Sequence, residues 1–480
     1  MGDRADCDLL LTGGAVITMD GARRVLDPGI VAVAEDRIVA VDTVPDGDQG
    51  WNAARTVDCR GCVVMPGLVD CHNHLFNSLS RGLGEGLSLW PWLRDFKWPY
   101  NSSITRDEAV AAVKLSAVEA ARAGVTSVLD HAYAPTEVET TLAIADAIEL
   151  VGLRGVVARG MLGPRTPGAE KKSARAGRGR DLYRNSVGEE IAMTEECMKA
   201  RPPGSRVAVW PGPLDVIYTS PELIRGAHDL AGRYGSGWHA HCSESQSDVP
   251  LFAERHGLRP IEWMAGEGLL RGRTTLAHMI WLDDREIALL GETGAGIAHN
   301  PVSNAYMGSG VIRLRELRDA GAVVGLGTDG PNVGHRQDMF EAMKTAILLQ
   351  RIRTLDATTT SAEEALELAT REGARYLGID AGSISPGMLA DLIVVDVSGA
   401  HTVPDNRAVT TAVYAARSSD VSMTIVGGDI VYEDGRCTRV DEDSVLEEAR
   451  ERSADLIHRA QLGDFLTPWA TVPGRRPVDG

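Results

Sequence analysis

Two histidines two positions apart stand directly after a short apolar run. His72 and His74 close the segment "CVVMPGLVDCHNH". In an extended strand, side chains two positions apart lie on one face, so both imidazoles can point at one common place. Converging neutral imidazoles are suitable ligands for zinc or iron, although the same pattern also fits two histidines that face solvent at a strand end. The choice between these readings depends on the rest of the chain.

Further polar residues end other strand-like segments. The run "SGWHAHCSES" contains His239 and His241 and is followed by Glu244, while His278 ends "TTLAHMI" and Asp329 ends "AVVGLGTDG". His241 lies nearer the carboxyl end of its strand and is therefore the better ligand. His239 is expected to fill the layer beneath it. Twelve histidines scattered at random would not fall on strand ends this often.

The elements that must position these residues alternate regularly. Strand-like runs such as "RGVVARGM" and "AVVGLGTDG" alternate with amphipathic helical segments such as "SPELIRGAHDLAGRYG". With the run before His72 they make eight β/α units, the number that closes a parallel barrel. We therefore predict an α/β fold with a (β/α)8 TIM-type barrel. Reactive residues of such barrels gather at the carboxyl ends of the strands, where the polar residues of this sequence fall.

Both ends of the chain resemble β structure. Alternating apolar residues with Gly, Asp and Pro between them occur early, in "DLLLTGGAVITMD", and again late, in "SMTIVGGDIVYEDG". We expect the two parts to form one small β-sandwich domain around the barrel insertion. The predicted division is 1–64 for the first part of the sandwich, 65–384 for the barrel, 385–440 for the second part, and 441–480 for a C-terminal helix and tail.

Composition restricts what the protein binds and where it works. The net charge of −18 repels nucleic acid and anionic membrane surfaces, so we expect neither as a partner. The sequence shows no signal peptide and no apolar stretch of the ~20 residues that a membrane span needs. Seven scattered cysteines suit a reducing compartment. We therefore expect a cytoplasmic protein that acts on a small molecule.

Several motifs in order resemble the amidohydrolase superfamily, in its cytosine-deaminase-like and triazine-hydrolase-like branch. They are "MPGLVDCHNH", "HAHCSES", "TLAHMIWLDDREIALLGETGAGIAHNPVSN", "GLGTDGPN" and "SISPGMLADLIVVD", and the similarity runs from residue 8 to about residue 436. The resemblance implies one divalent metal ion, zinc or iron. The ligands it implies are His72, His74, His241 and Asp329.

The resemblance also implies the catalytic groups. It makes Glu244 a proton shuttle and His278 a partner of the attacking water, while Asp329 can accept the proton of that water. Three imidazoles and one carboxylate leave a position open for water, whose pKa a metal ion lowers toward ~7. Two-metal members of the superfamily use a lysine after the fourth strand, and "RVAVWPGPLD" has none. We therefore expect a single ion.

Candidate substrate contacts are harder to assign. In the methylthioadenosine and adenosylhomocysteine deaminases of this branch, a Glu after the Pro of "KWPYNSSIT" holds the ribose hydroxyls, whereas this chain has Asn101, which weakens the nucleoside reading. Trp98 offers a flat surface or belongs to the core. His335 and Arg336 either read a carbonyl or anionic group or cap the following helix. The full set of candidate contacts is Trp98, Asn101, His299, Asn304 and His335.

Two local features and the assembly stay open at this point. Residues 163–190 are a basic, glycine-rich segment that is either a solvated loop or a lid. His131 either joins the polar rim or packs structurally. The apolar residues of the tail "FLTPWATVPGRRPVDG" lead us to expect a homodimer or a higher homo-oligomer.

The predicted reaction is hydrolytic deamination of an amino-substituted N-heterocycle such as a purine base, pterin or triazine. The alternatives are release of chloride or alkylamine from a triazine, opening of a cyclic amide, and deamination of a nucleoside. A barrel without catalysis is the remaining reading, but such a barrel has no need to retain four ligands together with Glu244 and His278.

Overall fold

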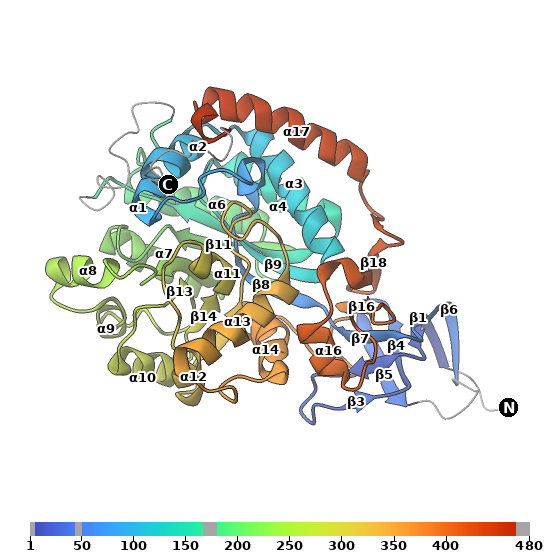
Figure 1. Ribbon diagram of the computed structural model, residues 1–480. Helices are drawn as coiled ribbons and strands as arrows, with labels where there is room; N and C mark the ends of the chain where they lie inside the picture. Colours follow the sequence, from blue (N-terminus) through green and yellow to red (C-terminus); the bar gives the residue numbers. More distant parts are fainter. Residues whose placement is uncertain (1–4, 44–49, 167–179, 467–480) are drawn as a thin grey trace, which may run out of the picture.

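The structure, a computed structural model, describes residues 5–43, 50–166 and 180–466. They form a large barrel surrounded by helices, with a smaller β domain at one side that carries the N-terminal strands (Figure 1). Among these residues no helix is long and apolar enough to cross a bilayer.

Eight short strands form the barrel, and nearly all of their residues are buried. Such apolar strands are typical of a parallel sheet with both faces covered. They are β8 (Leu68–Asn73), β9 (Val125–Ala132), β10 (Arg154–Met161), β11 (Val207–Pro213), β12 (Gly237–Cys242), β13 (Arg273–His278), β14 (Gly296–His299) and β15 (Val323–Leu326).

The barrel closes at two seams between two parallel four-stranded sheets, which have the orders β11-β10-β9-β8 and β12-β13-β14-β15. At the seam between β11 and β12, the Val216 N–H donates to the His241 carbonyl at 2.9 Å. At the seam between β15 and β8, the Asp329 N–H donates to the His72 carbonyl, also at 2.9 Å. The predicted TIM-type barrel is thereby confirmed, and three of the predicted metal ligands lie at its seams.

Helices follow the strands and form the outer layer (Figure 1). Several begin at capping boxes, such as Thr105 with Glu108 and Asp283 with Glu286, and several end at left-handed glycines such as Gly235. The helices are α3 (Arg106–Arg122), α4 (Val138–Val151), α6 (Val187–Ala200), α7 (Pro221–Tyr234), α8 (Asp248–His256), α9 (Pro260–Gly266), α10 (Asp284–Thr293), α11 (Pro301–Tyr306), α12 (Leu314–Asp319), α13 (Met339–Thr354), α14 (Ala362–Ala369) and α15 (Arg371–Leu377).

The connection after β8 builds one wall above the barrel mouth. It contains η1 (Leu75–Ser80), α1 (Leu89–Pro91), the π-helical turn η2 (Trp92–Lys97) and α2 (Trp98–Ser103). The C-terminal helix α17 (Glu442–Arg459) lies across η1 and α3 at the top of the view in Figure 1. The short turn η4 (Gly463–Leu466) follows it.

The small β domain has two sheets that enclose their own apolar core. One sheet has the order β5-β4-β1-β6 and the other β19-β18-β17-β16-β7-β2-β3. Its elements are β1 (Ala5–Thr12), β2 (Ala15–Ile17), β3 (Val25–Leu26), β4 (Gly29–Ala34), β5 (Arg37–Thr43), β6 (Trp51–Asp58), β7 (Cys62–Pro66), β16 (Leu392–Asp396), α16 (Ala408–Tyr414), η3 (Ser418–Asp420), β17 (Val421–Val426), β18 (Asp429–Glu433) and β19 (Arg436–Cys437).

Strands from the two ends of the chain pair directly in this domain. β16 pairs antiparallel with β7, and Val33 and Leu392 belong to one core cluster between the sheets. The predicted β-sandwich built from both termini is confirmed, while the division at residues 64, 384 and 440 stays a prediction.

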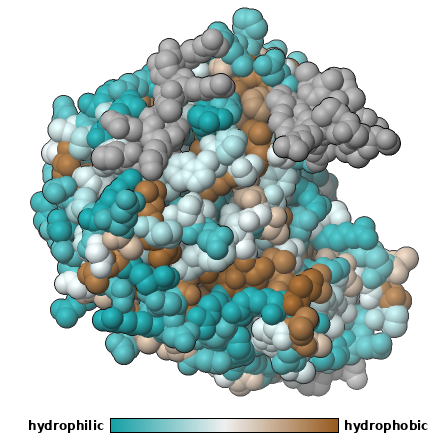
Figure 2. All heavy atoms as spheres, turned by 60° about the vertical axis from the view of Figure 1, so that its left-hand side comes forward, coloured by the Kyte–Doolittle hydropathy of each residue, from teal (hydrophilic) through white to brown (hydrophobic). Residues whose placement is uncertain are grey.

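On the face that Figure 2 shows, hydrophilic residues predominate and hydrophobic residues gather in a few bands.

Two expectations concern segments that the structure describes only in part. Residues 467–480, on which the homodimer prediction rests, lie outside the described residues, and so do residues 167–179 of the segment 163–190. The homodimer and the choice between loop and lid stay predictions.

A buried ion pair fastens the barrel to the small domain. Arg154, at the start of β10, donates to Asp391 with Nε and Oδ2 3.0 Å apart, and the Gly427 N–H donates to Oδ1 at 2.7 Å. The Asp391 side chain is only 1% exposed. Breaking a buried pair leaves the partner charge uncompensated.

We expect Asp391→Ala to lower the free energy of unfolding by about 3 kcal/mol in urea titrations. Asp429→Ala is the matched control, because Asp429 is 55% exposed where it pairs with Arg206. The control should cost less than about 1 kcal/mol. Equal losses in the two variants would show that the buried pair does not join the domains.

Candidate metal centre

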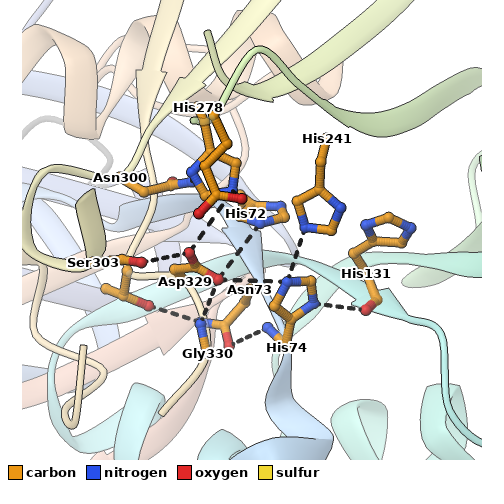
Figure 3. Close-up of polar contacts among 12 residues, drawn as sticks. His72, Asn73, His74, His131, His241, His278, Asn300, Ser303, Asp329 and Gly330 are labelled. Carbon is orange, nitrogen blue, oxygen red and sulfur yellow. Dashed lines mark hydrogen bonds and ion pairs between the residues drawn. The ribbon is translucent and has the colours of Figure 1, made fainter. Parts of the chain in front are cut away.

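The four predicted metal ligands converge at the barrel mouth (Figure 3). The Nε2 atoms of His74 and His241 are 3.1 Å apart. Oδ1 of Asp329 lies 3.4 Å from His74 Nε2 and 3.6 Å from His72 Nε2. Ligand atoms around a tetrahedral zinc ion, with bonds near 2.0–2.1 Å, are separated by roughly 3.3 Å. The spacing therefore suits one ion.

Hydrogen bonds fix the tautomers of two of these histidines. Nδ1 of His74 is 2.8 Å from the His131 carbonyl oxygen, and Nδ1 of His241 is 2.5 Å from the Leu214 carbonyl oxygen. A carbonyl oxygen can only accept, so each Nδ1 carries the proton. Burial lowers the pKa of both imidazoles well below the usual range, so both rings are neutral. Their Nε2 lone pairs consequently face each other with no proton between them.

A chain of hydrogen bonds fixes the tautomer of His72 as well. The Thr275 hydroxyl donates to the Trp238 carbonyl at 2.8 Å, so its oxygen is free to accept from Nδ1 of His239, 3.0 Å away, and the Tyr376 hydroxyl, 3.1 Å from the same Nδ1, can accept as well. Nε2 of His239 then has no proton and accepts from Nδ1 of His72 at 2.8 Å. Nε2 of His72 is left with a lone pair directed at Asp329, and it has no hydrogen-bond partner among the described residues.

Three imidazole lone pairs and a carboxylate oxygen thus face one another in a buried space. Such a set of acceptors is stable only around a cation, and three nitrogens with one oxygen suit zinc. Hydrogen bonds from the far side of each ring hold the lone pairs in place, as in known metal sites. His239 supports His72 from beneath, in the layer where the sequence placed it.

Glu244 and His278 lie beside this set. Nδ1 of His278 donates to Oδ1 of Asn304 at 2.9 Å. Its Nε2 is 3.8 Å from Oε2 of Glu244 and 3.9 Å from Oδ2 of Asp329. Burial lowers the pKa of His278, but the two carboxylates and the bond to Asn304 outweigh it, so that the pKa is raised overall. His278 can therefore present an Nε2–H to a substrate or water.

The backbone at two strand ends adopts the left-handed conformation, with φ 74° at His278 and 60° at Asp329. His241 pairs in register with Ala277, so in a regular strand the next residue, His278, would point out of the barrel. The left-handed turn returns its ring to the pocket. His and Asp are among the residues that tolerate this conformation, which is concentrated at functional sites.

A pocket with polar and apolar lining residues lies over these residues at the barrel mouth. Of the candidate substrate contacts, Trp98 and Asn101 line it. Asn304 is not a lining residue; its Oδ1 accepts a hydrogen bond from Nδ1 of His278. His299 and His335 are not among the lining residues.

The remaining undecided residues have packing or capping contacts. His131 is fully buried, and its Nε2 is 3.1 Å from the Gly212 carbonyl oxygen. The ring of His335 packs at 4.9 Å against Tyr306. Arg336 pairs with Glu341 in the first turn of α13 at 2.8 Å, as the capping alternative anticipated.

Some residues of the site were not anticipated from the sequence. Ser303, within the "HNPVSN" motif, donates to Oδ2 of Asp329 at 2.7 Å. Lys97, Tyr133, Asp215 and Asn332 line the pocket. The one sequence signal for Lys97 is a lysine between aromatic residues in "DFKWPY".

We expect the purified protein to bind about one zinc ion per chain. His74→Ala removes one of the facing lone pairs and should abolish stoichiometric binding, measured by elemental analysis after dialysis. His228→Ala is the control, because His228 lies on α7 with Nε2 3.2 Å from the Arg271 carbonyl oxygen, away from the pocket. A content near two ions per chain would contradict the single site.

Known proteins similar to this chain include several deaminases. It is 32% identical to a 5-methylthioadenosine/S-adenosylhomocysteine deaminase of Pelotomaculum thermopropionicum, over 94% of this chain and 99% of that one. It is 34% identical to a 5'-deoxyadenosine deaminase of Methanothermobacter thermautotrophicus, over 93% and 98%. The predicted class of reaction, hydrolysis of an amino group on a cyclic amidine, is confirmed.

Solved structures agree in fold. An adenosine deaminase from Xanthomonas campestris with bound zinc superposes with a TM-score of 0.87 at 27% identity, over 95% of this chain and 99% of that chain. A zinc-bound atrazine chlorohydrolase from Arthrobacter aurescens shares the fold, with a TM-score of 0.84 at 24% identity, over 93% and 100%. Both of these structures contain zinc, the ion expected from the sequence of this chain. The Amidohydrolase family profile matches residues 63–431, and the chain belongs to this family.

Proposed function

We propose that His72, His74, His241 and Asp329 hold the zinc ion of a hydrolytic deaminase, and that Glu244, His278 and Asp329 move the protons of its reaction. The observation that carries this proposal is the set of facing acceptor atoms with no proton between them. Supporting it, the carboxylates of Glu244 and Asp329 both line the pocket.

The substrate that we propose is an aminopurine, the ring common to the names of the deaminases at 32–34% identity. Asn101 stands where the nucleoside deaminases of this branch have a ribose-binding Glu, and this difference argued against a nucleoside substrate. The relatives now favour that reading, and Asn101 remains a pocket residue that can hydrogen-bond a hydroxyl. The free base and the nucleoside share the reacting ring.

A bound zinc ion supplies the nucleophile at neutral pH, because it lowers the pKa of water toward ~7. In the proposed reaction, water adds to the ring carbon that bears the amine, the carbon–nitrogen bond breaks, and ammonia leaves while the ring keeps an oxo group. Asp329 accepts a proton from the attacking water. The Ser303 hydroxyl donates to Oδ2 of Asp329 and holds this carboxylate in place. His278 donates its Nε2–H to the attacking oxygen and orients it.

Glu244 delivers protons to the substrate. It lies three residues after His241, lines the pocket, and has Oε2 3.8 Å from His278 Nε2. Addition to an aromatic carbon–nitrogen bond needs a proton on the adjacent ring nitrogen, and departure of ammonia needs another on the amine. One carboxyl group on the substrate side can serve both steps. Cytoplasmic location and a homodimer complete the proposal as expectations from the sequence.

We expect Glu244→Gln to keep the zinc content of the wild type and to lose on the order of 10²-fold or more in turnover. The amide keeps the size of the carboxyl group but cannot shuttle a proton. Ammonia release from aminopurines and their nucleosides measures the turnover. Glu254→Gln, an exposed position on α8, is the control and should retain activity. Near-wild-type turnover of Glu244→Gln with full zinc would refute this proton path.

A further inference from the structure

We propose that Lys97, with Asn77 and Asn332 beside it, forms a subsite that binds an electron-rich oxygen of the substrate, away from the carbon that loses its amine. The inference rests on the proposed deamination and narrows its substrate class. It follows from a buried amine in the wall of the pocket that the reaction itself does not use.

Lys97 ends the π-helical turn η2, a type of turn that occurs frequently at functional sites. Its side chain is fully buried and lines the pocket. Nζ donates to Oδ1 of Asn77 and lies over the rings of Phe76 at 4.8 Å, Tyr100 at 5.4 Å and Tyr133 at 5.4 Å. Among the described residues, no carboxylate forms an ion pair with it.

These contacts leave the amine incompletely bonded. The Lys97 amine has at least two N–H donors, and the side chain of Asn77 takes one of them. The aromatic rings offer attraction to a cation, but they do not replace the lost water in full. A methionine or leucine would fill the same space without this desolvation cost. The lysine is therefore explained by a hydrogen-bond acceptor that arrives with the substrate.

Asn332 provides a second, independent observation. Its side chain is 1% exposed and lines the pocket, and neither atom of its amide has a hydrogen-bond partner among the described residues. A Cβ at Gly330 would come within 2.7 Å of Oδ1 of Asn332 and 3.1 Å of Nδ2 of Asn77. The two amides thus meet over the backbone that directly follows Asp329, next to the metal centre.

Two substrate groups have the chemistry that this subsite recognises. One is a ring carbonyl, as in an amino-oxo purine or a pterin, and the other is a carboxylate on the substituent of a nucleoside. Both bring an electron-rich oxygen that can accept hydrogen bonds from the Lys97 Nζ and from the amide of Asn332. An unsubstituted 6-aminopurine ring offers neither.

The test uses two pairs of substrates with the zinc-loaded full chain. Isoguanine and adenine carry the amine at the same ring carbon and differ in a ring carbonyl, whereas S-adenosylhomocysteine carries the amino-acid carboxylate that methylthioadenosine lacks. We expect Lys97→Met to lower kcat/KM for the oxygen-bearing member of one pair by about tenfold or more, with little change for the other member. The affected pair identifies the source of the oxygen.

Binding gives a readout that does not depend on turnover. Xanthine and hypoxanthine differ by one carbonyl and lack an amino group to remove. If the ring carbonyl is the bound oxygen, the wild type should bind xanthine more tightly in calorimetry, and Lys97→Met should remove that difference. If the carboxylate supplies the bound oxygen, the Glu244→Gln protein should bind S-adenosylhomocysteine more tightly than methylthioadenosine. Adding Lys97→Met to that protein should remove the difference.

Two further variants separate the subsite from general damage. Asn332→Ala should shift the same ratio in the same direction, which keeps the proposal testable where Lys97→Met does not fold. Lys114→Met, on α3 with Nζ 3.5 Å from Glu448 Oε2, should leave both ratios unchanged. Equal effects on both members of both pairs, or no preference in the wild type, would overturn the subsite. Absence of ammonia release from every ring would instead overturn the deaminase.

Discussion

The mutual facing of three imidazole lone pairs and one carboxylate oxygen is the constraint on which the rest of this structure depends. Four acceptors at such separations repel one another unless a cation lies between them. The barrel holds them at the two seams where its sheets join, because His241 accepts a backbone bond at one seam and His72 accepts one from Asp329 at the other. Closure of the barrel thus brings the proposed ligands together.

Each histidine of this centre makes a hydrogen bond through Nδ1, on the side of the ring opposite the atom that faces the centre. Carbonyl oxygens accept from His74 and His241, His239 accepts from His72, and Asn304 accepts from His278. Such contacts fix both the tautomer and the direction of each ring, which is how a protein prepares ligands before the ion arrives. The wall built after β8 is different, because the Lys97 amine there donates to Asn77 alone and has further N–H donors without an acceptor among the described residues. In the proposals made above, the ion completes the reaction centre and the substrate completes the wall.

The fold and the convergence of His72 with His74 could be predicted because they depend on local rules, whereas the full set of proposed ligands was implied by the resemblance to the family. Alternating apolar runs with polar ends predict strands, and a spacing of two puts His72 and His74 on one face. The same rule does not extend to irregular backbone. His278 reaches the pocket only through its left-handed φ, whereas His299, one residue after the interior Ala298, does not line it. Lys97 and Asn332 depend on packing between distant segments, for which the spacing of residues carries no signal.

X-ray absorption at the zinc edge tests the central claim most directly. The account predicts a first shell of about three imidazole nitrogens and one or two oxygens at about 2.0–2.1 Å, with no second metal. Outer-shell scattering from three imidazole rings would establish the histidines. A metal–metal vector near ~3.5–4 Å, or a shell without three imidazoles in the wild type, would contradict the account.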